Sequence, residues 1–206
     1  MSAREEILAR VRTATATASP TEYDAPTHTA TPGSVELFVE RVADYRAVVE
    51  QCDATELASR VVAAVEGCSV VVPEGLGVEV PGAVVDAGLS SKDLDAIDAV
   101  VTEATVGIAE TGTIVLSHGS GQGRRAITLV PDRHVCIVRE DQVVADVQHA
   151  VSLLDPSTPL TWISGPSATS DIELERVEGV HGPRTLIVVL HPRTPPVDQG
   201  DADETR

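Results

Sequence analysis

The sequence has few aromatic residues and few cysteines, and it contains no long apolar run. Aromatic residues make up 2% of the 206 residues, so the core must be built from Val, Ile, Leu and Ala. Cys52, Cys68 and Cys136 form no C-x-x-C pair, which argues against a disulfide framework, a zinc site or an iron–sulfur cluster. No run of about 18 apolar residues and no signal-like segment occurs. We therefore expect a soluble, cytoplasmic protein without a cofactor of its own.

Basic residues are also scarce. The chain has 15 Lys and Arg against 32 Asp and Glu, a net charge of −17. This charge repels phosphate backbones and anionic lipid headgroups, so nucleic acid and membrane surfaces are poor candidate partners. Its simplest consequence is solubility, and a local pocket could still bind a small anion.

Composition divides the chain into three parts. Residues 1–34 comprise a short helix over 4–13, with Ile7, Leu8 and Val11 on one face, and a Thr-, Ala- and Pro-rich flexible linker. Residues 35–192 are predicted to form the compact domain, and residues 193–206 a disordered acidic tail. The first helix is either a frayed terminus or an arm that docks on a partner.

The compact part alternates helical and strand patterns. Two helical stripes come first, Phe38-Val42-Tyr45-Val49 and Leu57-Val61-Ala64-Val65, and Gly67 ends the second. Further helices are expected over 91–97 and 142–154. Short apolar runs typical of buried strands lie at 69–72, 83–85, 99–101, 113–116, 134–138, 160–163 and 185–190. The fold class predicted is α/β, with a mostly parallel sheet flanked by helices.

Three loop segments adjoin these strands and carry groups capable of chemistry. In Ala109-Glu110-Thr111-Gly112-Thr113, a partly buried Glu110 would have a raised pKa and could act as acid, base or nucleophile. The alternative is that Glu110 caps amides of the turn. In the segment Gly179-Val180-His181-Gly182-Pro183, His181 could shuttle a proton or could have a purely structural role.

The remaining segment runs from Gly165 to Glu173, directly after a predicted strand. Gly165 lets the backbone approach a ligand, and the hydroxyls of Ser167 and Thr169 with local amides could form an anion-binding nest. A Ser/Thr turn is the competing explanation. Asp171 could orient His181 or cap its own loop.

A glycine-rich stretch, Ser117–Arg125, superficially suggests a dinucleotide site. No third glycine at the right offset opens a helix there, and Ile127–Val130 is predicted to be extended, so the motif is weak. We interpret the stretch as a loop that carries an arginine pair. Either Arg124 or Arg125 could reach a bound carboxylate.

Taken in order, these motifs resemble a known family. The turn at Glu110, the step Pro131-x-x-His134, the segment Gly165-Pro166-Ser167-x-Thr169-x-Asp171-Ile172-Glu173 and Val180-His181-Gly182-Pro183 are similar to the signature of the LUD domain, specifically the lactate utilization protein C family. The resemblance covers about residues 35–190. It implies a fold like the sugar-phosphate isomerase and coenzyme A transferase superfamily, and a role in bacterial oxidation of L-lactate to pyruvate beside iron–sulfur partner proteins.

The resemblance supplies no proven catalytic residue, so the site is a hypothesis. Lactate oxidation needs an electron acceptor that this sequence does not encode, which leaves binding of lactate or pyruvate, or scaffolding of the redox partners. One shared pocket is expected, with Glu110 and His181 handling protons. The substrate-binding residues expected are Thr111, Gly112, Thr113, Arg125, Gly165, Ser167, Thr169 and Asp171. The alternatives are a coenzyme A transferase-like enzyme with Glu110 as nucleophile, and a non-catalytic assembly subunit.

Overall fold

The computed structural model describes residues 2–18, 31–169, 177–178 and 182–192. The expected linker lies partly outside these residues, and the expected acidic tail, Asp171 and His181 lie wholly outside them. The predicted first helix is present as α1 (Ala3–Thr15), and a capping box between Ser2 and Glu5 fixes its start. Ile7 and Val11 on this helix are exposed.

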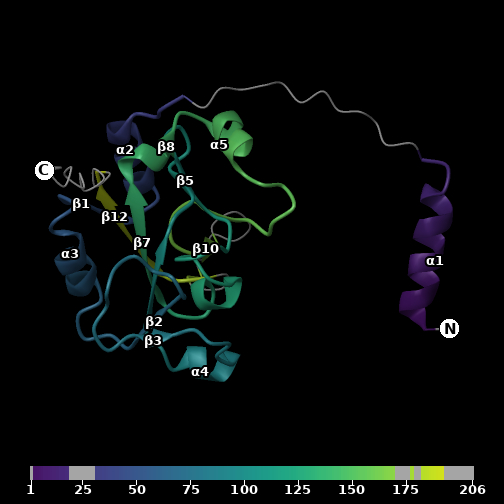
Figure 1. Cartoon of the computed structure of the whole chain (residues 1–206), viewed down its shortest axis with the longest axis horizontal. Coiled ribbons are helices and arrows are strands. Elements are labelled where there is room, and N and C mark those ends of the chain that lie inside the picture. Colours follow the sequence, from purple (N-terminus) through teal and green to yellow (C-terminus); the bar gives the residue numbers. More distant parts are fainter. Residues whose placement is uncertain (1, 19–30, 170–176, 179–181, 193–206) are drawn as a thin grey trace, which may run out of the picture.

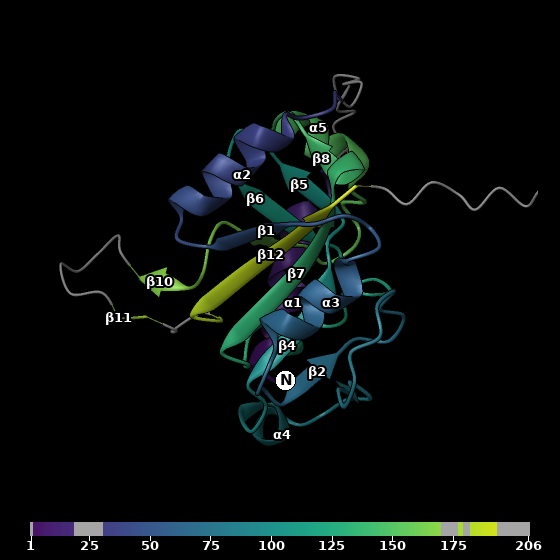
Figure 2. The ribbon, with the colours of Figure 1, turned by 90° about the vertical axis from the view of Figure 1, so that its left-hand side faces the viewer.

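A six-stranded parallel sheet forms the centre of the molecule (Figure 2). Its strand order is β1-β12-β7-β4-β2-β3. The bounds are β1 (Val48–Gln51), β2 (Val70–Val72), β3 (Val84–Val85), β4 (Ala99–Glu103), β7 (Arg133–Arg139) and β12 (Thr185–His191). Its long central strands are Val-rich and buried on both faces, as expected for a parallel sheet between two covering layers. The predicted fold class is therefore confirmed.

Alternate residues of the central strands face two different cores. Val135 and Ile137 of β7 pack with α3 (Leu57–Ala64), which covers one face of the sheet. Cys136 and Val138 point the other way, toward α2 (Val35–Asp44) and Phe38. This period of two is the pleat of a strand buried on both sides.

A second, smaller sheet covers the same face as α2 (Figure 1). Its order is β8-β5-β6-β9, with β5 (Val106–Ile108), β6 (Thr113–Leu116), β8 (Val143–Val144) and β9 (Thr161–Ile163). β6 runs antiparallel to both β5 and β9. The remaining elements are α4 (Ser91–Asp95), α5 (Val147–Leu153), the 3₁₀ turns η1 (Arg125–Thr128) and η2 (Glu140–Gln142), and the short pair β10 (Ala168–Thr169) and β11 (Val177–Glu178).

Three predictions about local structure were wrong. The helix expected through Val49 ends at Asp44, because Arg46 adopts a left-handed φ of 68° and the β-branched Val48 and Val49 pair with β12. Cys52 therefore follows a strand. In the segment 127–130, which was expected to be extended, the first two residues belong to η1 and the last two form a turn. The helix expected from 142 begins at Val147 because Val143 and Val144 pair with β5.

Within the described residues, no helix is long and apolar enough to cross a membrane. Cys136 is buried, Cys52 and Cys68 are half-buried, and all three are free thiols. The domain boundaries at residues 34 and 192 stay predictions.

Candidate functional site

A pocket of about 240 Å³ lies at the amino ends of β7 and β12. His134 and Leu186, the second residues of these strands, form its floor, and the loop after β9 forms a wall. Among the described residues of the predicted site, Arg125, Gly165 and Ser167 line it. The pocket thus joins the arginine loop to the Gly165 segment, which lie far apart in the sequence.

Arg125 is the arginine that faces this pocket. It lies in η1, is partly buried, and donates from one guanidinium nitrogen to the carbonyl oxygen of Thr128 at 2.9 Å and to its hydroxyl at 3.1 Å. Burial lowers the pKa of the Arg125 guanidinium, but an arginine remains charged at any ordinary pH. The pocket therefore contains a fixed positive charge in a chain of strongly negative net charge.

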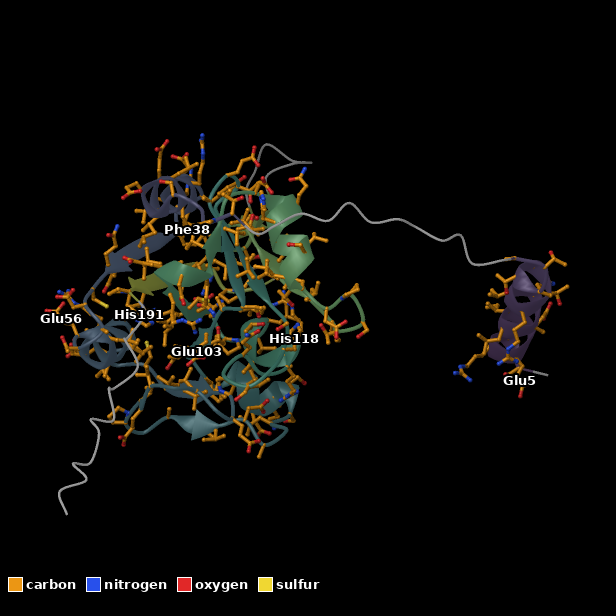
Figure 3. All side chains as sticks on the ribbon, turned by 45° about the horizontal axis from the view of Figure 1, so that its top comes forward. Glu5, Phe38, Glu56, Glu103, His118 and His191 are labelled. Carbon is orange, nitrogen blue, oxygen red and sulfur yellow. The ribbon has the colours of Figure 1, made fainter. Side chains whose placement is uncertain are left out.

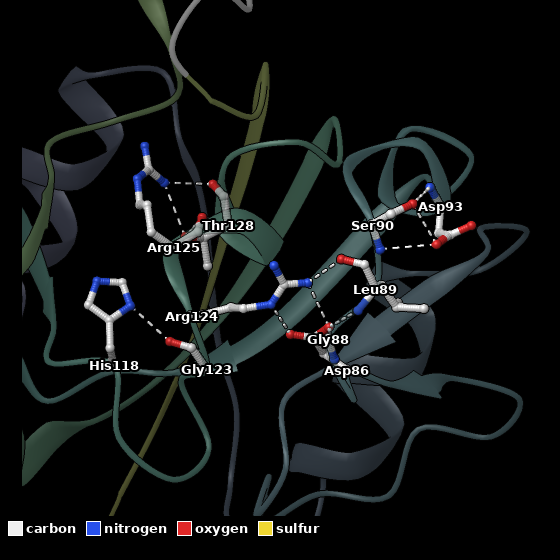
Figure 4. A network of polar contacts seen from close by, with 10 residues as sticks. All are labelled: Asp86, Gly88, Leu89, Ser90, Asp93, His118, Gly123, Arg124, Arg125 and Thr128. Atoms are coloured by element: carbon white, nitrogen blue, oxygen red, sulfur yellow. Dashed lines mark hydrogen bonds and ion pairs between the residues drawn. The ribbon is translucent and has the colours of Figure 1, made fainter.

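Arg124 points in a different direction (Figure 4). Its guanidinium forms a two-pronged ion pair with Asp86, at 2.7 and 2.9 Å, and also donates to the carbonyl oxygen of Leu89 at 2.6 Å. The Arg124 hydrogen bonds are the main reason that the pKa of Asp86 is lowered. Of the two arginines between which the sequence left the choice open, Arg125 lines this pocket and Arg124 does not.

His134 is a pocket residue that the sequence identified only as part of a motif. Its Nε2 lies 2.8 Å from the hydroxyl of Thr102, and the ring is 1% exposed. Burial, and secondarily the charge of Arg125, lower the pKa of His134 to about 4, so the ring is neutral near pH 7. Nδ1 has no hydrogen-bond partner among the described residues. A neutral imidazole that lines the pocket can exchange a proton or a hydrogen bond with a ligand.

The loop from Ser164 to Ser167 is shaped by Gly165. This glycine has a left-handed φ of 81°, and a Cβ there would lie 2.5 Å from the Cβ of Tyr45. The amide of Ser167 donates to the carbonyl oxygen of Pro183 at 2.8 Å, which holds the loop beside the turn at 182–183. Thr169 is described only as backbone of β10, and Asp171 and His181 lie outside the described residues.

The turn at Glu110 is adjacent to the pocket without lining it. Glu110 is exposed, so the partial burial expected for its side chain is not found. Gly112 has a φ of 58°, and a Cβ there would lie 2.5 Å from the backbone of Arg41, which gives this glycine a packing role. The hydroxyl of Thr113 contacts that of Thr111 at 2.7 Å and that of Ser164 at 2.9 Å. Within the described residues, this hydroxyl chain is the connection from the turn to the pocket wall.

A second histidine, His118, contacts a residue of the pocket wall; it was not singled out as a site residue from the sequence. The ring of His118 bridges the carbonyl oxygen of Gly123 and the hydroxyl of Thr161, each at 2.8 Å. Thr161 lines the pocket. His118 therefore ties the glycine-rich loop that precedes Arg125 to β9.

The arrangement suits a small anion. It combines the partly buried cation of Arg125, the hydroxyl groups of Thr128, Thr161, Ser164 and Ser167, and the neutral ring of His134. At about 240 Å³ the pocket is smaller than the roughly 300–1,000 Å³ typical of drug-sized ligands. Among the described residues, no group of three or more His, Cys, Asp or Glu side chains is placed to hold a metal ion.

Comparisons with known proteins give a consistent result. A family model described as the LUD domain matches residues 86–191. The chain is 43% identical over 182 residues to a Deinococcus radiodurans protein named lactate utilization protein C, covering 82% of this chain and 84% of that protein. It is 32% identical to lactate utilization protein C 1 of Bacillus mycoides, where the match covers about half of each chain.

A solved structure is also similar. The crystal structure of a DUF162 family protein from Deinococcus radiodurans matches with a TM-score of 0.65 and 38% identity. The match covers 76% of this chain and 95% of that one.

Proposed function

The chain belongs to the LUD domain family, and we propose that it serves lactate utilization by binding a small carboxylate, such as lactate or pyruvate, in the pocket around Arg125. The name of the relative that is 43% identical supports the pathway. The observation that carries the binding role is the partly buried Arg125 in a pocket lined by hydroxyl groups.

Each end of an α-hydroxy acid has a proposed partner. The carboxylate binds the guanidinium of Arg125, with Ser167 and neighbouring amides completing its hydrogen bonds. Thr169, in β10, stays a further ligand predicted from the sequence. His134 contacts the hydroxyl group through Nδ1, and His181, which lies outside the described residues, remains a second candidate for this role. Glu110 is less suited because it is exposed and does not line the pocket.

The redox step is assigned to partners. Oxidation of lactate to pyruvate removes two electrons, and an acceptor such as a flavin, a nicotinamide or an iron–sulfur relay must receive them. The sequence contains no binding fingerprint for such a group. We therefore propose iron–sulfur lactate utilization proteins as partners, to which this chain presents or from which it receives the carboxylate. The exposed Ile7 and Val11 of α1 favour a docking role for that helix within the same assembly.

Growth on L-lactate tests this function. In a bacterial host that lacks its own lactate utilization protein C, we expect the wild-type chain to restore growth. Arg125→Gln and Ser167→Ala should each abolish that growth while the melting temperature changes little. Arg60→Gln is the matched control, because Arg60 is exposed on α3 and makes only a loose ion pair with Glu56 at 3.8 Å.

Two results would contradict the proposal. Full growth with Arg125→Gln would show that the pocket is not needed for lactate utilization. Unfolding of both pocket variants would instead assign these residues a structural role.

A further inference from the structure

A second pocket, of about 200 Å³, lies at the opposite end of the same sheet. It adjoins the carboxyl ends of β4, β7 and β12, where Glu103, Arg139 and His191 are the last residues of the three strands. Along β7 it is about 16 Å from His134 in the first pocket, given a rise of roughly 3.3 Å per residue. Open α/β sheets commonly bind ligands at the carboxyl ends of their strands. None of the motifs that carry the family resemblance contributes to this pocket.

Glu103 is held by two glycine-containing loops. The amide of Gly77 donates to Oε1 of Glu103 at 2.8 Å, and a Cβ on Gly121 would lie 2.8 Å from Oε2. Gly121 also receives a hydrogen bond from the Glu103 amide and has a φ of 72°. The glycine-rich stretch of the sequence thus builds the wall around a carboxylate. Oε2 receives no hydrogen bond within the described residues, so it is available as an acceptor.

His191 supplies a second acceptor. Its Nδ1 lies 2.8 Å from the carbonyl oxygen of Pro192, and a carbonyl oxygen can only accept, so Nδ1 carries the proton. In the neutral ring this leaves Nε2 with a lone pair. The side chain is 5% exposed and lines the pocket. Figure 3 shows Glu103 and His191 in the same part of the molecule.

Arg139 provides the opposite charge at the rim. Its Nε pairs with Asp141 at 2.9 Å, and its other guanidinium nitrogens make no hydrogen bond within the described residues. The side chain is 44% exposed. Leu57, Val78 and Ile137 add an apolar wall. The pocket thus combines one cation, two hydrogen-bond acceptors that lack donors, and room for a short carbon chain.

We propose that this pocket is a second binding site, for small acids that carry a hydroxyl or amino group beside the carboxylate. The carboxylate pairs with Arg139, and the hydroxyl or amino group donates to Glu103 and to Nε2 of His191. This proposal does not rest on the function proposed for the Arg125 pocket. Hydroxy acids and amino acids share the chemistry that these groups recognise.

The test is an amide NMR titration of the full chain with L-lactate, L-alanine and propionate. The Gly77 amide reports on the second pocket because it is bonded to Glu103, and the Ser167 amide reports on the first. We expect the amide resonance of Gly77 to shift saturably with L-lactate, with L-alanine or with both. Propionate should bind at this site at least about tenfold more weakly, because it has no hydroxyl or amino group to donate a hydrogen bond. A response to only one of the two identifies the class of acid.

Variants separate the second site from the first. Glu103→Gln and Arg139→Gln should each weaken the response of the second pocket about tenfold, read from its remaining amides, and leave the Ser167 response unchanged. Glu140→Gln is the control, because Glu140 neighbours Arg139 without lining the pocket. If Glu103→Gln fails to fold, the Arg139→Gln variant at the rim still tests whether the second pocket binds the acid. The proposal is overturned if the Gly77 amide responds to neither L-lactate nor L-alanine. It is also overturned if propionate produces an equal response.

Discussion

The buried His134 should make the stability of this protein fall as the pH is lowered. The folded protein holds the pKa of His134 at about 4, against an ordinary value of 6.5. In the unfolded chain the ring gains a proton as the pH drops below about 6.5, whereas the folded ring stays neutral until about pH 4. The unfolded state therefore binds more protons in this window, and folding loses free energy as the pH falls through it.

The size of the effect follows from the two pKa values. Between about pH 7.5 and pH 5 the loss from this one group is about 2 kcal/mol, and it approaches about 3 kcal/mol below pH 4. His134→Gln removes the titrating ring and keeps a side chain able to bond Thr102. Urea unfolding of both proteins at the two pH values measures the difference. The aspartates with lowered pKa, such as Asp86 and Asp132, also favour unfolding in acid, but they are common to both proteins and cancel.

We expect the wild-type protein to lose about 2 kcal/mol more than His134→Gln on acidification. Arg125→Gln should reduce the pH sensitivity by a smaller amount, because the charge of Arg125 is the secondary cause of the lowered pKa. Equal pH dependence in the wild-type protein and His134→Gln would refute the reasoning and mean that the ring is not held neutral.

Three further predictions concern the core, the chain ends and the absence of a cofactor. Phe38→Ala should lower the free energy of unfolding by about 3–5 kcal/mol in urea, because the ring is 0% exposed in the core shared by α2 and the sheets; a loss below about 1 kcal/mol would contradict this. Limited proteolysis should cut first within residues 14–34 and 195–206, from their low apolar content, and leave a core of about 35–192; early cuts inside that core would count against these boundaries. The purified protein should be colourless, and an absorption band that persists through dialysis at one equivalent per chain would show a bound flavin or cluster.

Much of the sheet could be predicted from local pattern alone. The runs at Val70–Val72, His134–Val138 and Thr185–Leu190 are strands because continuous β-branched and apolar residues suit a strand buried on both faces. Two strands of the second sheet, β6 and β9, coincide with the predicted runs at 113–116 and 160–163. The other two, β5 and β8, were missed because they are only three and two residues long and carry no repeating pattern. β1 was missed because Val49 also fits a helical stripe, and only the φ of Arg46 ends that helix.

The loops of the candidate pocket could be predicted from the sequence, but its strand residues could not. Arg125, Gly165 and Ser167 were proposed as site residues because glycine, hydroxyl and charged residues beside strand ends are typical of ligand loops, and the structure places all three in one pocket. His134 was assigned no site role because a histidine inside an apolar run looks like a core residue. Glu103 and His191 end their strands, and nothing in the local sequence indicates that three strand ends share a pocket. Such convergence depends on strand order, which sequence pattern does not specify.

The central claim is that the Arg125 pocket binds a small carboxylate, and a pyruvate titration monitored at the Ser167 amide tests it most directly. Pyruvate is the probe of choice because it lacks the donor that the second pocket requires. We predict a saturable shift for the wild-type protein, at least about tenfold weaker binding for Arg125→Gln, and unchanged binding for Arg60→Gln. A Ser167 amide that does not respond to pyruvate, or that responds identically in Arg125→Gln, would contradict the account.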